Sequence, residues 1–272
     1  VIFHVDANSA FLSWSAAYRV QVLGEELDLR TVPSVVAGDK ESRHSIILAK
    51  SGPAKKYGIQ TGEPLFLALE KCPSLQIVEP DYSLYVECSR HFVEVLRQFS
   101  PCVEQYSIDE AWVDMTGTQR LFGPPVLAAD VLRRKVLEEL GFTVNVGISS
   151  NELLAKMAGD FEEPTEIHTL FPEEIPSKMW PLPVKDLFLV GSATERKLRL
   201  LGIYTIGDLA KADPGLLRRK LGKHGETIWH YANGRNAELV TPEPAEAKGF
   251  GNSVTTAKDV VSTEEAHQVL LS

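Results

Sequence analysis

Three acidic residues stand where predicted strands end. Asp6 closes the apolar run at the N-terminus, and Asp109 and Glu110 lie side by side in the apolar stretch 106–114. Neighbouring strand residues point to opposite faces, so burying both carboxylates without a counter-charge is costly. A bound divalent cation removes that cost, and Mg²⁺ takes oxygen ligands from carboxylates and substrate phosphates. We therefore expect a magnesium site at Asp6, Asp109 and Glu110.

The chemistry expected of such a site is phosphoryl transfer. Two cations held by paired carboxylates clamp the attacking and leaving oxygens of that reaction. The alternative is that these residues are turn carboxylates that cap local backbone amides, because Asp before a helix is a common N-cap. Such capping explains Asp6 well when it is taken alone, and it explains the Asp109–Glu110 pair as well as a cation site does. The three residues together favour the cation site.

The surrounding elements decide whether the three carboxylates meet. Apolar runs and helical spacing predict a strand at 1–5, a helix at 9–23, a helix at 82–99, a hairpin at 103–115, a helix at 124–140, a strand at 143–149 and a helix at 151–160. This order is typical of the split β-α-β-β-α-β arrangement of ferredoxin-like α+β folds. If the central strands pair, Asp6 and Asp109 meet at one sheet edge, with Glu110 beside them. Two helices on one face leave the other face open for a substrate.

The second half of the chain has a different character. Prolines cluster at 172–183, and glycines then punctuate short predicted helices, which indicates a small helical domain. Residues 185–223 carry nine basic and four acidic side chains, although the whole chain has a formal net charge of −9. Such a local excess favours a phosphate-facing surface, and a solvated helix face is an equally good alternative. The acidic, proline-containing stretch 241–247 predicts a linker before a further unit.

Bulk properties narrow the class of protein. A chain of 272 residues with 44% hydrophobic composition predicts two or more domains. It contains no apolar stretch of about 18 residues and no secretory signal, so we expect a cytoplasmic protein. The three cysteines, Cys72, Cys88 and Cys102, are odd in number and form no CxxC pair. We expect reduced thiols rather than a disulfide framework or a zinc site.

Six segments together resemble a known family. They are VDANSAF at 5–11, KKYGI at 55–59, YSIDEA at 106–111, VGISSN at 146–151, LVGSAT at 189–194 and GNSVT at 251–255. In this order, and over essentially the whole chain, they resemble the Y-family DNA polymerases and within them the bacterial DNA polymerase IV-like enzymes. A single Ser-Ile-Asp-Glu-Ala is fairly specific, and the ordered set is highly specific.

The resemblance implies an α+β architecture and an activity. Its parts would be a ferredoxin-like palm at 1–9 and 77–170, a small fingers insertion at 10–76, a helix-hairpin-helix thumb at 171–240, a linker at 241–248 and the start of a little finger at 249–272. It implies low-fidelity, template-directed addition of deoxynucleotides to a primer 3′ end, in lesion bypass during DNA repair. The implied partners are primer-template DNA, deoxynucleoside triphosphates and a sliding clamp, the last through a C-terminal region beyond this sequence. We expect a monomer with no membrane partner.

The resemblance also assigns roles at the cation site. It implies two Mg²⁺ ions, which Mn²⁺ can replace, bridged by Asp6 and Asp109. The Ala7 carbonyl would be a backbone ligand, and Glu110 would complete the site that activates the primer 3′-hydroxyl. Phe11 falls at the position of the family's steric gate, an aromatic ring that collides with a ribose 2′-hydroxyl. Without the family, Phe11 is interpreted as a core aromatic of the first helix.

A further set of residues is implied to bind the nucleotide. The set comprises Ala7, Asn8, Ser9, Ala10, Phe11, Ile46, Leu48 and Lys55. Backbone amides at 9–11, at a helix N-terminus, would hold triphosphate oxygens. Ile46 and Leu48 would roof the nascent base pair, and the short roof would permit distorted template bases. Lys55 would pair with a phosphate.

Three positions depart from the family pattern. Many relatives carry Tyr and Arg where this chain has Gly52 and Lys55, and Lys lacks the bidentate geometry of Arg. Glu163 precedes a proline where relatives often carry Lys, and an acidic side chain there would repel a triphosphate. Lys50 or Lys156 is the candidate to compensate. These departures bear on nucleotide affinity and catalytic speed more than on the class of reaction.

Two other functions stay open. A catalytically weak or inactive polymerase relative would bind DNA as an adaptor, and Gly52 and Glu163 favour that alternative. A nucleotidyl cyclase also uses paired carboxylates on a split sheet, but it has no need of segments that grip duplex DNA. Salt-dependent binding of primer-template DNA separates a polymerase from a cyclase.

Overall fold

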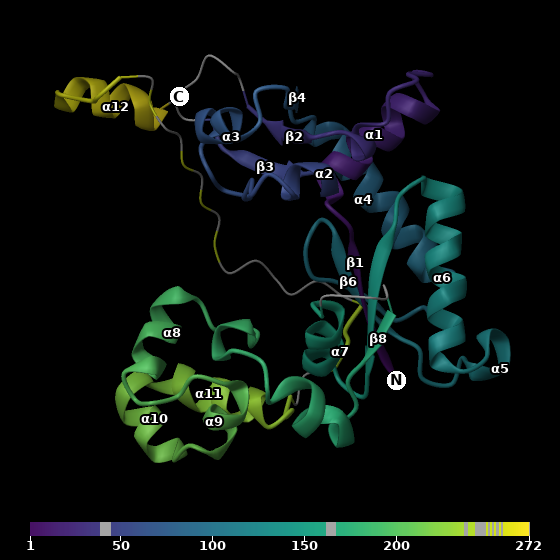
Figure 1. Cartoon of the computed structure of the whole chain (residues 1–272), viewed down its shortest axis with the longest axis vertical. Coiled ribbons are helices and arrows are strands. Elements are labelled where there is room, and N and C mark those ends of the chain that lie inside the picture. Colours follow the sequence, from purple (N-terminus) through teal and green to yellow (C-terminus); the bar gives the residue numbers. More distant parts are fainter. Residues whose placement is uncertain are drawn as a thin grey trace. The chain divides into compact units, whose positions relative to one another are not determined.

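The chain forms two compact units, Val1–Pro242 and Glu243–Ser272. The computed structural model describes residues 1–38, 45–161, 167–236, 239–242, 249, 251, 253, 256 and 258–271. The larger unit contains a five-stranded sheet, a three-stranded sheet and a group of short helices (Figure 1). No helix in this described part is both long enough and apolar enough to span a bilayer.

The five-stranded sheet has the order β5-β6-β1-β7-β8. Its strands are β1 (Ile2–Ala7), β5 (Val103–Gln105), β6 (Glu110–Asp114), β7 (Val144–Ser149) and β8 (Ile167–Thr169). β1 pairs antiparallel with both β6 and β7, β5 is antiparallel to β6, and β8 is parallel to β7. The four strands from β5 to β7 form the predicted ferredoxin-like arrangement. β8 extends its edge.

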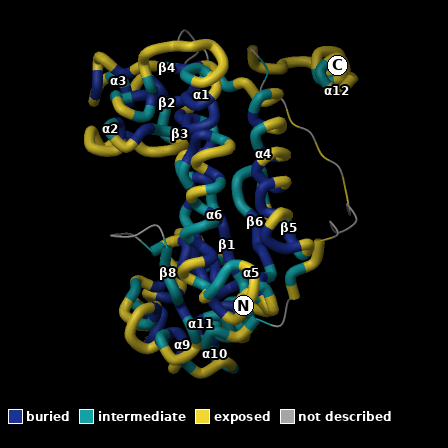
Figure 2. Tube along the Cα trace, turned by 90° about the vertical axis from the view of Figure 1, so that its right-hand side faces the viewer, coloured by how far each residue is buried: buried dark blue, intermediate teal, exposed yellow. Residues whose placement is uncertain are grey.

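Two long helices cover one face of this sheet, as predicted. They are α4 (Tyr82–Arg97) and α6 (Pro125–Leu140), and they share a core with Phe3 and Val5 of β1. Each turn of α4 has a buried side and an exposed side, as an amphipathic helix at a surface requires (Figure 2). Asp81 is the N-cap of α4, and its carboxylate accepts a hydrogen bond from the Leu84 amide.

The opposite face is partly covered, whereas we expected it to be left open. α7 (Glu152–Gly159) packs on β7 and β1 there, and α6 and α7 lie on opposite sides of the strands (Figure 1). The close approach depends on Gly147 of β7, where an added Cβ would stand 1.9 Å from the carbonyl oxygen of Ala155. The prediction was wrong because it counted only the two long helices as packing elements.

A smaller sheet of order β3-β2-β4 follows the first helix. Its elements are β2 (Ser34–Ala37), β3 (Ile47–Lys50) and β4 (Gln76–Val78), with α2 (Gly52–Lys55) and α3 (Leu65–Lys71). The helix α1 (Ala10–Gln21) joins the two sheets. Its Trp14 packs into the core of the large sheet, whereas Leu12 and Ala16 pack against Val36 of β2.

The predicted helical region follows β8. It contains α8 (Ser192–Arg199), α9 (Ile206–Lys211), α10 (Pro214–Leu221) and α11 (Lys223–Ala232), preceded by the short turns η2 (Pro172–Glu174), η3 (Ile175–Met179) and η4 (Val184–Asp186). Its core includes Leu153, Leu154 and Met157 of α7. α7 is buried along its whole length because one side meets the sheet and another meets this helical group.

The smaller unit contains α12 (Thr263–Leu271) among its described residues. Glu264 and Glu265 lie in its first turn, where carboxylates interact favourably with the helix dipole. Leu270 and Leu271 at its end are exposed. Residues 243–248 of the predicted linker lie outside the described residues.

Candidate active site

The pairing of β1 with β6 brings the acidic residues together. Asp6 stands opposite Glu110 in the antiparallel register, so both side chains lie on the same face of the sheet. Asp109 occupies the turn before β6, and its carbonyl oxygen accepts a hydrogen bond of 2.9 Å from the Ala7 amide. The three predicted carboxylates come from segments far apart in the sequence and meet at one end of the sheet.

A polar turn holds Asp109 in place. The Ser107 hydroxyl donates to Oδ1 of Asp109 at 2.6 Å. The Gln105 side-chain amide donates to the Ser107 carbonyl at 3.0 Å and to the Ser89 hydroxyl of α4 at 2.9 Å. The turn is therefore tied both to β5 and to α4, so it has a defined conformation rather than the freedom of a surface loop.

The carboxylates repel one another in a partly buried position. Burial, together with the neighbouring charges of Glu110 and Asp109, raises the pKa of Asp6 to about 7. The ammonium of Lys156 acts in the opposite direction and is outweighed. Perturbation of this kind is characteristic of functional sites, because folding has placed like charges together without neutralising them.

Glu110 has two close partners on the same oxygen. Its Oε2 accepts hydrogen bonds from Nζ of Lys156 at 2.6 Å and from Nε2 of His4 at 2.8 Å. Burial raises the pKa of Glu110, but these hydrogen bonds outweigh burial and lower it to about 2. Burial lowers the pKa of His4, so its neutral ring donates through Nε2–H.

Sequence-based reasoning missed His4 as a residue of the site. The available signal was its position two residues before Asp6 in a predicted strand, which places both side chains on one face. Lys156 entered only as a candidate to compensate for departures elsewhere, whereas the structure pairs it with Glu110.

The chain turns sharply between β1 and α1. Ser9 has a φ of 48°, in the left-handed region that residues other than glycine rarely adopt. Asn8 anchors the turn, because its backbone amide donates to the Thr143 carbonyl and its side-chain amide to the Thr143 hydroxyl, both at 3.0 Å. The first amides of α1 have no partner within the helix, and Ser9 lines the same pocket as Asp6.

That pocket has a volume of about 240 Å³ and joins the carboxylates to α1 and β3. It is lined by Asp6, Ala7, Ser9, Ala10, Phe11, Leu48, Ala49, Lys50, Thr61 and Asp109. Asn8, Ile46 and Lys55, which the sequence also placed at the nucleotide, do not line it, and the last two are exposed. Lys50 contributes its side chain instead, with Nζ donating to the Ile59 carbonyl at 2.9 Å.

Phe11 is fixed in an aromatic cluster at the wall of this pocket. Its ring stacks on Tyr85 with the ring centroids 4.5 Å apart and the planes 8° from parallel. The rings of Tyr82 and Trp14 approach it at 6.3 and 6.0 Å. Tyr85 is fully buried, and its hydroxyl is hydrogen-bonded to Ser15. Phe11 therefore has little freedom to move aside.

Of the positions that depart from the family pattern, the structure describes Gly52 and Lys55 but not Glu163. Gly52 begins α2, and no atom lies within 4 Å of the position that its Cβ would take, so the space for a larger side chain is present. The Ser51 hydroxyl caps this helix by accepting a hydrogen bond from the Ala54 amide at 3.1 Å. Glu163 lies outside the described residues.

The donor set suits a hard divalent cation. Carboxylate and carbonyl oxygens are the ligands that Mg²⁺ prefers, and a cation relieves the repulsion that raises the pKa of Asp6. Among the residues that the structure describes, no three His, Cys, Asp or Glu side chains are gathered closely enough to hold a metal by themselves. Mg²⁺ takes much of its coordination shell from water and substrate phosphates.

The helical region carries a second candidate contact surface. Leu189 has a φ of 69° just before Gly191, which begins α8, and Arg196 and Lys197 are exposed on that helix. Within the described ranges, Leu189 and Ser9 are the two residues other than glycine with positive φ. Strained backbone of this kind concentrates at ligand-facing turns.

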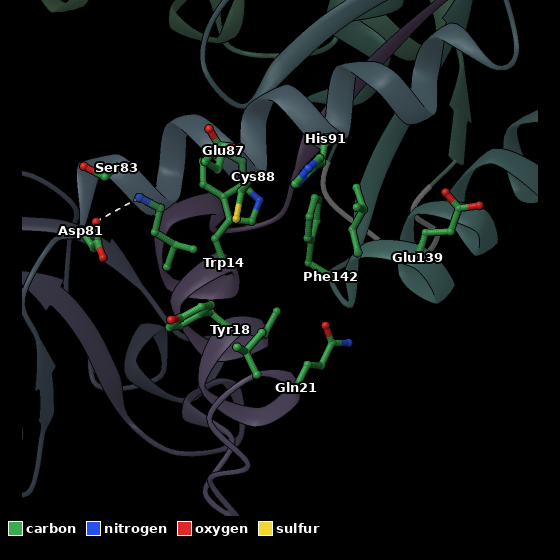
Figure 3. Close-up of a pocket in the computed structure, with 14 residues that line it drawn as sticks. Trp14, Tyr18, Gln21, Asp81, Ser83, Glu87, Cys88, His91, Glu139 and Phe142 are labelled. Carbon is green, nitrogen blue, oxygen red and sulfur yellow. Dashed lines mark hydrogen bonds between the residues drawn. The ribbon is translucent and has the colours of Figure 1, made fainter.

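A separate pocket of about 570 Å³ lies between α1, α4 and the end of α6 (Figure 3). None of the predicted site residues lines it. Of the three carboxylates that line it, Glu87 and Glu139 are paired with Arg90 and Lys135, and Asp81 accepts a hydrogen bond from the Leu84 amide. Burial raises the pKa of the Cys88 thiol, which also faces it, to about 11, so this thiol is not an activated nucleophile.

Comparison with known proteins agrees with this geometry. Residues 5–160 match the model of the impB/mucB/samB family, and residues 172–203 match the model of the IMS family HHH motif. The chain is 47% identical to the DNA polymerase IV of Clostridium acetobutylicum, over all of this chain and 68% of that protein. It is 39% identical to the DNA polymerase IV of Clostridium kluyveri, over all of this chain and 66% of that protein.

A solved structure supports the same relationship. DinB from Sulfolobus solfataricus superimposes with a TM-score of 0.75 at 25% sequence identity, over 88% of this chain and 68% of that one. The chain thus spans about two thirds of the length of the curated relatives that it matches.

Proposed function

Because the chain belongs to the Y family of DNA polymerases, with DNA polymerases IV as its curated relatives, we propose that it extends a primer 3′ end by template-directed addition of deoxynucleotides. The observation that carries this proposal is the register of β1 and β6, which sets Asp6 against Glu110 with Asp109 beside them. The substrates are primer-template DNA and deoxynucleoside triphosphates, and the biological use is low-fidelity copying past lesions.

Asp6, Asp109 and Glu110 are the proposed cation-binding residues, with the Ala7 carbonyl as a further oxygen ligand. The proposed cofactors are two Mg²⁺ ions, which Mn²⁺ can replace. When bound, such ions stabilise the charge on the attacking and leaving oxygens of a phosphoryl transfer. The chain's own contribution is to hold the carboxylates in register at a partly buried position, where their mutual repulsion favours a cation.

The start of α1 is the proposed binding site for the triphosphate. The first amides of a helix point outward without partners, and the helix dipole favours an anion there. The turn at Ser9 presents these amides in the pocket that contains Asp6. Lys50 supplies a cation in the same pocket, and Lys55 is proposed to meet a phosphate from the exposed side of α2. Asn8 supports the turn through its bonds to Thr143.

Phe11 is the proposed sugar gate. Because the ring is stacked on Tyr85, it cannot give way to a ribose 2′-hydroxyl without disrupting the aromatic cluster. Leu48 lines the pocket, and Ile46 beside it is exposed; both are proposed to cover the nascent base pair. A cover made of two aliphatic side chains leaves room for a distorted template base.

The chain is proposed to divide as polymerases of this family do. The proposed parts are a palm at 1–9 and 77–170, fingers at 10–76, a thumb at 171–240, a linker at 241–248 and the start of a little finger at 249–272. The turn before α8 would contact backbone phosphates of the DNA without reading its sequence. A sliding clamp is a further proposed partner.

An inactive adaptor is the alternative that a specific observation favours. Gly52 leaves empty space where many relatives carry a triphosphate-gripping side chain. The three carboxylates argue against this alternative, because a DNA-binding adaptor has no use for the repulsion that they create. The cyclase alternative is disfavoured by the match of residues 172–203 to the HHH motif.

Single-nucleotide primer extension tests the proposal. The protein is incubated with Mg²⁺, each deoxynucleotide and primer-templates that present each of the four bases, beside Asp109→Ala and the control Asp114→Ala at the other end of β6. We expect preferential addition of the complementary nucleotide, lost in Asp109→Ala and kept in Asp114→Ala. Binding of the DNA without extension at any nucleotide concentration would favour the adaptor.

A further inference from the structure

A buried polar cluster behind the carboxylates has no part in the reaction proposed so far. We propose that Lys156, supported by His4, is a positioning residue. Its ammonium holds Glu110 and is the resident counter-charge with which an incoming divalent cation competes for that carboxylate. This inference rests on the proposed function, because it takes Glu110 to be a cation ligand.

Two hydrogen bonds hold one carboxylate oxygen of Glu110 and leave the other for a ligand. Both Nζ of Lys156 and Nε2 of His4 donate to Oε2, at 2.6 and 2.8 Å. The side chains of His4, Lys156 and Glu110 are 0%, 11% and 14% exposed, so water competes weakly for these bonds. The carboxylate is held in one orientation, and Oε1 is the oxygen that remains for a ligand.

The position of Lys156 is itself determined by packing. It comes from α7, which sits directly on β7 because Gly147 has no side chain to hold the helix away. Its ammonium also lies over the rings of Tyr106 and Phe188, 5.9 and 5.6 Å from their centroids. Aromatic faces attract a cation, so these rings favour the same placement.

The charges around Lys156 make it a competitor of a metal ion. Nζ of Lys156 forms an ion pair with Oε2 of Glu110 at 2.6 Å, and both side chains are largely buried. A fixed positive charge beside two proposed cation ligands reduces the attraction that they offer to a second cation. The same charge keeps Glu110 oriented when no cation is bound.

Removing this charge should move two measurable quantities in opposite directions. Cation affinity should rise, because the competing ammonium is gone. Turnover should fall, because Glu110 loses its orientation, while the KM for the nucleotide should stay constant, because Lys156 does not line the nucleotide pocket. A merely structural role for Lys156 predicts loss of stability without this split.

Direct measurement of cation binding tests the first half. Mn²⁺ binding is followed by electron paramagnetic resonance of the free ion, without DNA or nucleotide, for wild type, Lys156→Gln and Lys156→Arg. We expect Lys156→Gln to bind Mn²⁺ about 3–10-fold more tightly, as loss of one nearby charge implies. Lys156→Arg keeps the charge and should remain within about twofold of wild type. The matched control is Lys135→Gln, at a partly exposed lysine of α6 that is paired with Glu139.

Kinetics in a Glu110→Gln background test whether Lys156 acts through Glu110. In the wild-type background we expect Lys156→Gln to lower kcat about tenfold, with the nucleotide KM unchanged. In the Glu110→Gln background the same change should add less than about a twofold loss. Thermal unfolding of each variant verifies folding, and His4→Gln, which keeps a side-chain donor, supplies a second variant.

The outcomes separate this inference from the proposed function. Unchanged or weaker Mn²⁺ binding in Lys156→Gln overturns the inference, and normal primer extension alongside it leaves the proposed function intact. Tighter Mn²⁺ binding without any primer extension by wild type supports the counter-charge and contradicts the proposed function. If the fold-losses in kcat of Lys156→Gln and Glu110→Gln multiply fully in the double variant, the claim that Lys156 acts through Glu110 is overturned.

Discussion

Asp6 is a carboxylate that folding places in an unfavourable electrostatic position. Its folded-state pKa of about 7 lies above the ordinary value of 3.8 because of burial and the charges of Glu110 and Asp109. Between these two pH values the folded protein binds a proton that the unfolded chain does not. The contribution of Asp6 to the free energy of unfolding therefore falls as the pH rises from about 4 to about 7, and it is lowest above that range. The charge repulsion that destabilises the cation-free protein also favours the binding of a cation.

Replacing Asp6 by Asn should therefore stabilise the cation-free protein in a pH-dependent way. We expect the gain to be small near pH 4, to grow up to about pH 7 and then to level off on the order of 2 kcal/mol. Thermal and urea unfolding in the presence of EDTA, at pH 4.5 and pH 8, measure it. A gain of the same size at both pH values would mean that the charge of Asp6 is not its source.

Phe11 should control which sugar the enzyme accepts. Phe11→Ala opens the wall of the pocket beneath the sugar, so we expect the preference for deoxynucleotides over ribonucleotides to fall about 10–200-fold. The ratio of kcat/KM for the two nucleotides with the same base measures this preference. Phe66→Ala, at an exposed phenylalanine of α3, is the matched control. An unchanged ratio in Phe11→Ala would contradict the assignment.

The sequence predicted the acidic residues of the site but not their neighbours. Asp6, Asp109 and Glu110 stand out because carboxylates in apolar stretches are unusual, and the structure brings them together. Of their partners, His4 did not stand out, and Lys156 was named only as a candidate to compensate for departures elsewhere. Their role depends on the strand register and on helix packing, which are long-range properties that no local pattern contains.

Helix α7 is the element on which the site depends. It is buried along its whole length, between the sheet and the core of the helical region, and it carries Lys156 toward Glu110. The sequence predicted this helix but not its position. Six of its eight residues are apolar or glycine. A helix of that composition packs against neighbours on most of its sides, and this signal could have shown that part of the second sheet face would be covered.

Gly147→Ala should displace this element. The added Cβ would lie 1.9 Å from the Ala155 carbonyl oxygen, which is backbone and cannot move alone. We expect a loss of about 1–3 kcal/mol in the free energy of unfolding. Thermal or denaturant unfolding measures it, with Gly52→Ala as control, where no atom lies within 4 Å of the new Cβ. Equal stability of the two variants would contradict the described packing of α7.

At the scale of the whole molecule, an acidic chain is proposed to bind a polyanion through one basic region. The formal net charge is −9, but residues 185–223 carry an excess of basic side chains. On α8, Arg196, Lys197 and Arg199 are all exposed, and Arg199 is paired with Glu195. The sequence located this region from composition alone, and the folded helices were needed to show which basic side chains remain exposed.

Removing the charges of Arg196 and Lys197 on α8 should weaken DNA binding in a salt-dependent way. For Arg196→Ala/Lys197→Ala we expect lower affinity for primer-template DNA. The slope of log K against log salt should be reduced by about 1–2, and the change should be similar for every DNA sequence. Fluorescence anisotropy at several salt concentrations measures the slope. The double variant Arg134→Ala/Lys135→Ala on α6 is the control, and an equal effect there would assign the loss to net charge rather than to this surface.

The central claim is that Asp6, Asp109 and Glu110 form one catalytic cation site. Single-turnover nucleotide incorporation with Mg²⁺ tests it most directly, for wild type, Asp6→Asn, Asp109→Asn, Glu110→Gln and the control Asp114→Asn. We predict a loss of about 10³-fold or more in each of the first three variants and less than about twofold in the control. Incorporation at the wild-type rate by any of the first three, with the protein folded, would contradict the claim.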